Sequence, residues 1–335
     1  MKTSSRSVKQ PYIGGSFASG DDDNFILNSP GFSLFPDSIG QRSRMFFETG
    51  SDAIASQIQN LNELWLPENF CRATAKRILL KCKSIKIHYY ANPDQAFAGG
   101  AKRGILLLHY NKYDPLISQI AARNINLPGV FIIEDFVQAP FDVSKLQGHS
   151  AITSLRKICT AELAVAYMGH EAKEGEVNSD YLKLKLAAMS LREEFLQTGN
   201  SLMEKKHQEK MQQAAQAENN PSIYLSSESE KSHGAKIDFV QIKQRRQANR
   251  KFLENILCNI PEIEILPSDY FFLMVRLKNR DAVRKALFAH GIFPPIHWVD
   301  SGHADGLLSL PIDQRYDKND MERLANVLLQ AIQVR

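Results

Sequence analysis

The residue types best able to carry chemistry in this chain are a carboxylate, an amide and an amine that follow a short apolar run. The run Val130–Ile133 predicts a buried strand; Glu134 and Asp135 come next, then Gln138, with Lys157 further on. A carboxylate at the end of a buried strand is costly unless a cation or hydrogen-bond donors meet it. These three groups beside an open α/β sheet are those that hold pyridoxal phosphate, with Asp135 on a protonated pyridine nitrogen and Gln138 on the ring oxygen.

Lys157 supplies the amine of this set. A lysine becomes a usable nucleophile when burial or neighbouring cations lower its pKa, and Arg156 is adjacent in the sequence. Thr153 and Ser154 offer hydroxyls to a phosphate. Plainer interpretations stay open at this stage, because most lysines are solvated surface groups and Asp135 could belong to a structural ion pair at a strand end.

The segment Thr49–Ala53 is a second candidate for phosphate binding. Gly50 permits an unusual backbone turn, and a helix that starts at Ser51 would direct free N–H groups and its positive dipole end at a ligand there. Taken alone, the segment is better explained as a simple helix cap.

The remaining motifs indicate no further binding or metal site. The sequence contains no P-loop, no GxGxxG and no HExxH. His170–Glu171 and His303 have no partners at metal-ligand spacing, so no metal site is predicted. His109 follows an apolar run, where open α/β sheets bind ligands, and either a role in the site or an ordinary loop position is consistent with that place.

Composition indicates an ordinary globular protein. The net charge is +4 on 41 basic and 37 acidic interspersed residues, which does not indicate nucleic-acid binding. The basic residues of 243–246 and 250–251 are expected on a solvated helix face. No apolar run approaches a membrane span, no secretory signal is recognisable, and the four cysteines lack CxxC spacing and are expected to be reduced. We therefore expect a cytoplasmic protein that binds neither nucleic acid nor membrane.

The elements that must position these residues follow from periodicity. Strands alternate with helices in the first half, which predicts parallel strands in βαβ units. Helices are expected at residues 51–60, 70–80, 115–122, 180–217, 237–257, 280–290 and 320–334, strands at 63–67, 85–90, 103–109, 130–133 and 271–276, and an extended piece at 292–298. The Ser/Asn-rich stretch 219–234 predicts a loop and a domain boundary. The expected organisation is an N-terminal arm (1–40), a large α/β domain (41–218) and a smaller C-terminal α/β domain (235–335).

Several of these segments, in order along nearly the whole chain, carry a resemblance. The chain resembles the DegT/DnrJ/EryC1/StrS aminotransferases, the sugar-aminotransferase branch of the fold-type I pyridoxal phosphate enzymes. The segments are Ile13–Gly15, Thr49–Ala53, Trp65–Pro67 through Cys71, Ile133–Ala139, Ser154–Lys157, Asp238–Arg246 with Asn249, and Leu310–Tyr316. The ordered set, rather than any single segment, is specific.

The resemblance implies a fold and a role for each candidate residue. The fold would be the aspartate aminotransferase-like one, a large domain with a mixed, mostly parallel seven-stranded sheet and a smaller C-terminal α/β domain. Lys157 would carry pyridoxal phosphate through its amino group, Asp135 would keep the pyridine nitrogen protonated, and Gln138 would contact the ring hydroxyl. The backbone of Gly50 and Ser51, with Ser154, would bind the phosphate.

The resemblance also implies an activity and partners. An amino group would pass from glutamate or a similar donor to a nucleotide-linked keto-sugar in surface polysaccharide biosynthesis. Lys157 would move the proton, acting as base and then acid. The protein would be a homodimer with its active site at the interface, where residues 226–229 would reach the partner's phosphate. The presence of Lys157 argues against the dehydratase branch, which has histidine at that position.

The chain departs from the family pattern at three places. No glycine pair follows Lys157, Cys71 stands where an aromatic ring often stacks on the cofactor, and the asparagine segment of the second subunit is missing. Two alternatives therefore stand beside an active aminotransferase. One is a pyridoxal phosphate-binding relative with another reaction or no catalysis, and the other is an α/β binding protein without this cofactor.

Overall fold

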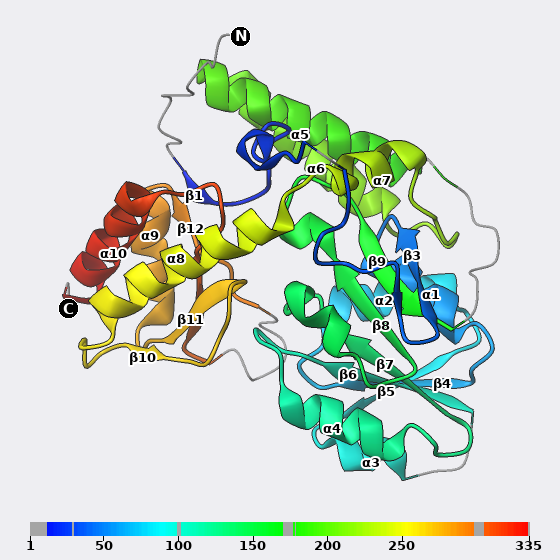
Figure 1. Ribbon diagram of the computed structural model, residues 1–335. Helices are drawn as coiled ribbons and strands as arrows, with labels where there is room; N and C mark the ends of the chain where they lie inside the picture. The colour runs from blue at the N-terminus through cyan, green and yellow to red at the C-terminus, as the bar shows by residue number, and fades with distance from the viewer. Residues whose placement is uncertain are drawn as a thin grey trace.

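The computed structural model describes residues 12–28, 30–98, 102–169, 177, 179–297 and 305–333. Residues 1–11 of the predicted arm lie outside this part of the chain, as do His170–Glu171, His303 and the predicted element ends at Trp298 and Val334. Figure 1 shows a large twisted sheet with its helices, a smaller assembly of short strands and helices, and a long helix that links the two.

The large sheet is mixed and mostly parallel. Its spatial order is β2-β3-β9-β8-β7-β6-β4-β5. Strands β5, β4, β6, β7 and β8 run parallel, and β9, β3 and β2 continue the sheet antiparallel. The bounds are β2 Ser38–Ile39, β3 Arg42–Phe47, β4 Glu63–Pro67, β5 Lys86–Tyr90, β6 Arg103–Leu108, β7 Val130–Asp135, β8 Ser150–Ser154 and β9 Ala164–Met168. The expected number of seven strands is corrected to eight, because the two-residue β2 pairs with the edge strand β3.

Helices cover both faces of this sheet, and strand periodicity explains why. In β6, Leu106 and Leu108 pack under α1 (Gly50–Ile58) and α2 (Arg72–Lys81), whereas Ile105 and Leu107 face the side of α3 (Pro93–Phe97) and α4 (Pro115–Asn124). Successive side chains of a strand point to opposite faces, so a strand buried on both sides is apolar throughout. The predicted strand at 103–109 is confirmed on this basis.

Helices also dominate the stretch after β9. Helices α5 (Asp180–Thr198) and α6 (Ser201–Ala217) form an antiparallel pair, joined at Gly199, whose φ of 69° ends α5 in the left-handed conformation. The expected loop at 219–234 is wrong in part, because α7 (Glu228–Ala235) begins there. The side chain of Ser227 caps α7 by accepting from the amide of Glu230.

The smaller assembly holds the C-terminal part. Strands β10 (Glu264–Ile265), β11 (Phe272–Arg276) and β13 (Leu307–Pro311) form an antiparallel sheet, packed with α9 (Arg280–Ala289) and α10 (Lys318–Gln333). The long helix α8 (Phe239–Leu257) buries its beginning in the core of the large sheet and its end in this second core (Figure 1). The division into domains at residues 219–234 stays a prediction.

The predicted N-terminal arm contains short regular elements. Strand β1 (Ile13–Gly14) pairs in parallel with β12 (Ile292–Phe293), and the 3-10 helix η1 (Asp23–Phe25) follows. Gly14 has a φ of 93°, and a Cβ there would lie 2.5 Å from the carbonyl oxygen of Phe293. Only glycine therefore allows this close pairing.

The prediction that the basic residues of α8 lie on a solvated face is wrong for Arg246. Arg246 is 1% exposed and is among the largest fully buried side chains of the described residues. Its neighbours Arg245 and Lys251 are exposed, as predicted. Among the described residues, no helix is both long enough and apolar enough to span a membrane.

Candidate functional site

The site lies at the carboxyl ends of β6, β7 and β8, on the face covered by α1 and α2. Leu108, Asp135 and Ile152 are neighbours across the three strands, because Asp135 pairs with both of the others. Ser154 follows Ile152 by two residues and so shares its face. Ligands of open α/β sheets bind at this edge.

One cavity of about 130 Å³ brings all the predicted site residues together. Its lining includes Gly50, Ser51, Asp135, Gln138, Ser154 and Lys157. The sequence analysis did not foresee other members of the lining, namely Ile54, Thr74, Arg77, Leu108, Val137, Ile152 and Glu218. Cys71, which stands at the ring-stacking position, lines it as well, together with the aromatic ring of its neighbour Phe70.

Asp135 is a buried carboxylate with one hydrogen bond to backbone. It is 4% exposed, and the amide of Val137 donates to its Oδ1 at 2.8 Å. Burial raises the pKa of Asp135 to about 7, although that hydrogen bond and the charge of Lys157 act in the opposite direction. A cation placed against Asp135 would favour its ionised form.

Glu134 points to the opposite face and has no part in this cavity. Its carboxylate accepts from Ser118 Oγ at 2.8 Å, from the amide of Gly148 at 2.5 Å, and from His109 Nε2 at 3.0 Å. His109 Nδ1 accepts the amide N–H of Asp114, so Nε2 carries the proton that Glu134 accepts. The candidate His109 is thus a structural residue, with both ring nitrogens in use.

Gln138 is oriented by the backbone of the neighbouring strand end. The amide of Asn111 donates to Gln138 Oε1 at 3.0 Å, which leaves the Nε2 donor of Gln138 for the cavity side. Asn111 itself has a positive φ of 61°, a conformation that asparagine tolerates better than most residues. An amide donor suits the contact with a ring oxygen that the sequence predicted.

Lys157 ends the 3-10 helix η3 (Leu155–Lys157) and borders three cavities. The residue is exposed and the three cavities reach its side chain, yet desolvation still acts on its ammonium. This desolvation and the charge of Arg156 lower the pKa of Lys157 to about 8. A large fraction of the amine is neutral near that pH, as a nucleophile and base requires.

The other end of the cavity is rich in unused donors. Gly50 and Ser51 open helix α1, where first-turn amides have no acceptor within the helix. Ser154 is 2% exposed, and its Oγ has no hydrogen-bond partner in the described part of the chain. A Cβ built on Gly50 would meet nothing within 4 Å, so this wall leaves open space.

Arg156 and Arg77 make this region electropositive, but both are held in ion pairs. Glu218 pairs with Arg77 at 3.1 Å and with Arg156 at 3.3 Å. Arg156 Nη1 also donates to the hydroxyl of Tyr181 at 2.5 Å. Sequence reasoning flagged Arg156 by adjacency to Lys157, whereas no local pattern marks Arg77 or Glu218, which come from distant helices.

Two larger chambers adjoin Lys157 on the side of the small sheet. One, of about 310 Å³, is lined among others by Phe17, Lys185, Phe271, Phe272 and His297. The other, of about 360 Å³, is lined among others by Phe17, Phe271, Phe293, Arg284 and Arg315. Both combine aromatic rings with cations, so they suit an anionic ligand with a flat or apolar part.

Two further observations complete the site. The described residues contain no group of three or more His, Cys, Asp or Glu side chains that could hold a metal ion. Ser226, expected to reach a partner subunit, is 2% exposed within its own chain, and Ser227 is engaged as the cap of α7. The contribution of residues 226–229 to a second subunit stays a prediction.

No protein-family model matches the sequence, and no curated protein matches it significantly. Solved structures match over nearly the whole chain. A DegT/DnrJ/EryC1/StrS aminotransferase from Brucella abortus superposes with a TM-score of 0.58 at 14% identity, over 88% of this chain and 87% of that one. DesI, solved with its TDP-sugar product, gives 0.60 at 14% identity, over 94% and 88%. A Streptococcus pneumoniae protein, solved in PLP and PMP forms, gives 0.61 at 10% identity, over 92% and 93%.

The chain has the fold of the DegT/DnrJ/EryC1/StrS aminotransferases. The fold-type I architecture that the sequence predicted, a mostly parallel sheet with a smaller C-terminal α/β part, is thereby confirmed. At these identities the likeness concerns the fold, and a function must be argued from the residues of the site.

Proposed function

We propose that this chain is a pyridoxal phosphate-dependent aminotransferase. The observation that carries the proposal is that Asp135, Gln138, Ser154 and Lys157 meet at one cavity with the first turn of α1. These residues come from three different segments, so their meeting is a property of the tertiary structure. The Streptococcus pneumoniae protein solved in PLP and PMP forms has this fold.

The residues present fit this cofactor. The unpartnered hydroxyl of Ser154, the first-turn amides of α1 and the open space beside Gly50 suit a phosphate. Asp135 is a buried carboxylate without a cationic partner within ion-pair distance among the described residues, and a protonated ring nitrogen would supply one. Lys157 provides the amine.

The bound group would supply an aldehyde carbon and an electron-withdrawing ring. The chain supplies the rest. Lys157 would hold the aldehyde through Nζ, and its free amine would move a proton as base and then acid. Asp135 would keep the ring nitrogen charged, and its burial would make that electrostatic effect large. Gln138 would orient the ring through its amide.

We further propose glutamate as donor and a nucleotide-linked keto-sugar as acceptor. The two chambers beside Lys157 have the volume and the mixed aromatic and cationic lining that such an anionic substrate needs. DesI, which has this fold, was solved with its TDP-sugar product. A cytoplasmic homodimer acting in surface polysaccharide biosynthesis completes the proposal.

The test uses purified protein with added pyridoxal phosphate. Wild type should develop a visible absorption band that borohydride abolishes, and Lys157→Ala should develop none. Lys185→Ala is a matched control, because Lys185 also lines a chamber beside Lys157 but pairs with Glu162 at 3.7 Å. A borohydride-sensitive band that persists in Lys157→Ala would contradict the assignment of Lys157 as the residue that attaches the cofactor.

Addition of glutamate to the same protein distinguishes an active aminotransferase from the two alternatives. Loss of the band with release of 2-oxoglutarate marks an aminotransferase. A band that glutamate leaves unchanged marks a cofactor-binding relative with another reaction or none. No band in wild type marks a binding protein without the cofactor.

A further inference from the structure

The carbonyl oxygen next to Lys157 is held by two side chains from the C-terminal part of the chain. Gln314 Nε2 donates to the oxygen of Ile158 at 2.7 Å, and Arg246 Nη2 donates to the same atom at 3.1 Å. Ile158 is the C-cap of η3, directly after Lys157, so this oxygen is one peptide away from the attachment point of the Lys157 side chain. Both donors are buried.

Every polar atom of the Gln314 side chain is engaged. Its Nε2 also donates to Asp22 Oδ1 at 2.8 Å, and its Oε1 accepts from Arg246 Nε at 2.9 Å. Asp22 Oδ2 in turn accepts the amide N–H of Thr160 at 2.5 Å. The two ends of the segment 158–160 are therefore fixed by one connected set of buried hydrogen bonds. Such a set gives rigidity when all its members are satisfied.

Arg246 is held in an unusual way for a buried cation. No ion pair found in the described part of the chain includes Arg246, and the charges of Asp313 and Asp22 offset its burial only in part. It donates instead to neutral acceptors: Gln314 Oε1 and the carbonyls of Ile158 and Tyr270. Burial lowers the pKa of Arg246. Burying a charge without an ion-pair partner costs free energy. We therefore expect the role of Arg246 to lie in the hydrogen bonds that it donates.

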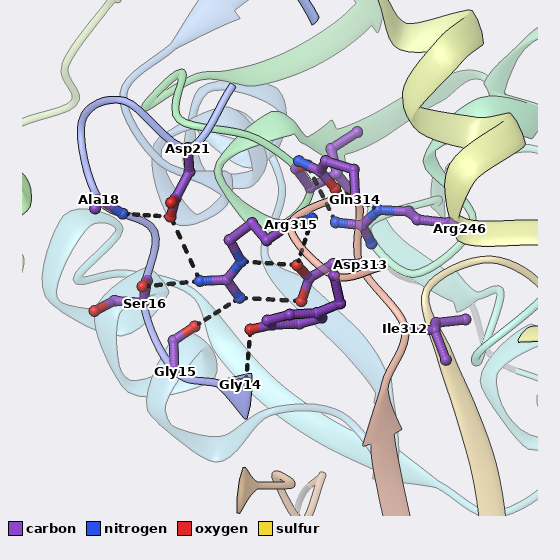
Figure 2. A network of polar contacts seen from close by, with 12 residues as sticks. Gly14, Gly15, Ser16, Ala18, Asp21, Arg246, Ile312, Asp313, Gln314 and Arg315 are labelled. Atoms are coloured by element: carbon purple, nitrogen blue, oxygen red, sulfur yellow. Dashed lines mark hydrogen bonds and ion pairs between the residues drawn. The ribbon is translucent and has the colours of Figure 1, made fainter. Parts of the chain in front are cut away.

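Figure 2 shows how the loop 313–316 divides its contacts. Gln314 meets Arg246 on one side, while Arg315, paired with Asp313, meets the N-terminal segment on the other. Arg315 donates to the carbonyls of Gly15 and Ser16. The side chain of Gln314 thus connects Arg246 and the carbonyl of Ile158 with Asp22 of the N-terminal segment.

The segment after Lys157 is buried. It has no glycine pair, and Ile158, Cys159 and Ala161 are packed into the core of the large sheet. We propose, on the basis of the proposed function, that Gln314 and Arg246 are positioning residues, which fix the direction of Lys157 by holding the carbonyl of Ile158. Neither residue lines the cavity that holds Asp135, and Gln314 acts on Lys157 through the backbone of Ile158, whereas Arg246 also lines the chamber of about 360 Å³ beside Lys157.

The experiment measures the amine of Lys157 in the protein without cofactor. An amine-reactive acylating reagent is applied across a pH series, and modification of Lys157 is quantified by mass spectrometry. Wild type should reach half-maximal reactivity at about pH 8. Gln314→Met, which keeps the volume but removes the three hydrogen bonds, should shift the midpoint upward by about one pH unit, because Lys157 leaves its desolvated position beside Arg156. The kcat should fall at least tenfold, with the KM for the amino donor little changed.

Tyr316→Phe is the matched control in the same loop. It removes the hydrogen bond from the amide of Gly14 to the Tyr316 hydroxyl, at 2.6 Å, and leaves Gln314 in place. It should lower thermal stability without moving the Lys157 midpoint. Should Gln314→Met not fold, Arg246→Lys replaces it, since lysine keeps the charge but cannot hold both Ile158 and Gln314 as the guanidinium does.

A folded Gln314→Met or Arg246→Lys protein with the wild-type midpoint overturns the positioning role. An equal shift in Tyr316→Phe overturns it too, because the effect would then reflect general loosening of the loop. Failure of the proposed function is seen separately, as a wild-type protein that gains no visible band with pyridoxal phosphate. The acylation series needs no cofactor and still decides the positioning role.

Discussion

Glu134 and Asp135 are adjacent in β7, yet their side chains lie on opposite faces of the sheet and their pKa values move in opposite directions. Burial raises the pKa of both, but for Glu134 the hydrogen bonds from His109, Gly148 and Gln147 outweigh it, and its pKa is lowered. Asp135 has one such bond and a raised pKa of about 7. One carboxylate is therefore satisfied by the protein, and the other is left for a ligand.

Replacing Asp135 by asparagine should stabilise the protein without cofactor at alkaline pH. The folded pKa of Asp135 lies above its usual value of 3.8, so wild type loses stability as pH rises from about 4 to about 7. The full shift corresponds to at most about 4 kcal/mol. Thermal or urea unfolding of both proteins at pH 5 and pH 8 checks this. The advantage of Asp135→Asn should grow between the two, and an equal difference at both would contradict it. With cofactor bound, the same variant should lose activity at least a hundredfold.

Glu134→Gln should have the reverse pH dependence. The folded pKa of Glu134 is depressed, so its stabilisation is present above its unfolded pKa and is lost as pH falls through the folded value. We expect a loss of about 2 kcal/mol at pH 7, since one hydrogen bond to a charged acceptor contributes about 1.5–3 kcal/mol. The difference from wild type should shrink below about pH 4. Urea titrations at pH 7 and pH 3.5 measure it, and a constant difference would show that the charge of Glu134 is not involved.

Ser154→Ala should separate cofactor binding from stability. The Ser154 hydroxyl has no partner in the described part of the chain, so its removal should leave unfolding free energy within about 0.5 kcal/mol of wild type. Affinity for pyridoxal phosphate should fall about tenfold, equivalent to 1.4 kcal/mol. Thr153→Val is the matched control on the same strand, because Thr153 Oγ1 donates to the carbonyl of Phe136 at 3.3 Å. It should cost stability and spare affinity. Equal affinities for Ser154→Ala and wild type would remove Ser154 from the site.

Two glycines should respond in opposite ways to substitution. Gly50→Val places a side chain in open space at the start of α1, so the protein should fold normally and lose cofactor affinity at least tenfold. Gly14→Ala forces a Cβ to 2.5 Å from the carbonyl of Phe293 at a φ of 93°, so it should destabilise the pairing of β1 with β12 by about 1–3 kcal/mol. Melting curves and cofactor titrations of both variants test the contrast. A destabilised Gly50→Val with unchanged affinity would contradict it.

Sequence patterns located the elements whose residues carry their own signal. The apolar runs at 63–67 and 130–133 are strands, and the amphipathic run at 115–122 belongs to α4. Strand β8 was missed because its residues, Ser150–Ser154, are small and mostly polar, yet all are buried between two neighbouring strands. Its burial results from its position between two strands of the sheet, and a short stretch of sequence does not reveal that position.

The sequence by itself determined the chemical types at the candidate site and their order: an acid and an amide after a buried strand, a glycine before a helix, and a hydroxyl before a lysine. Periodicity also placed Asp135 at a strand end. Only the tertiary structure decided that Asp135, rather than Glu134, faces the cavity, because register and strand parity set the face of each side chain. It alone brought Arg246 and Gln314 to the carbonyl of Ile158, since hydrogen bonds between residues far apart in the chain depend on how the two parts pack.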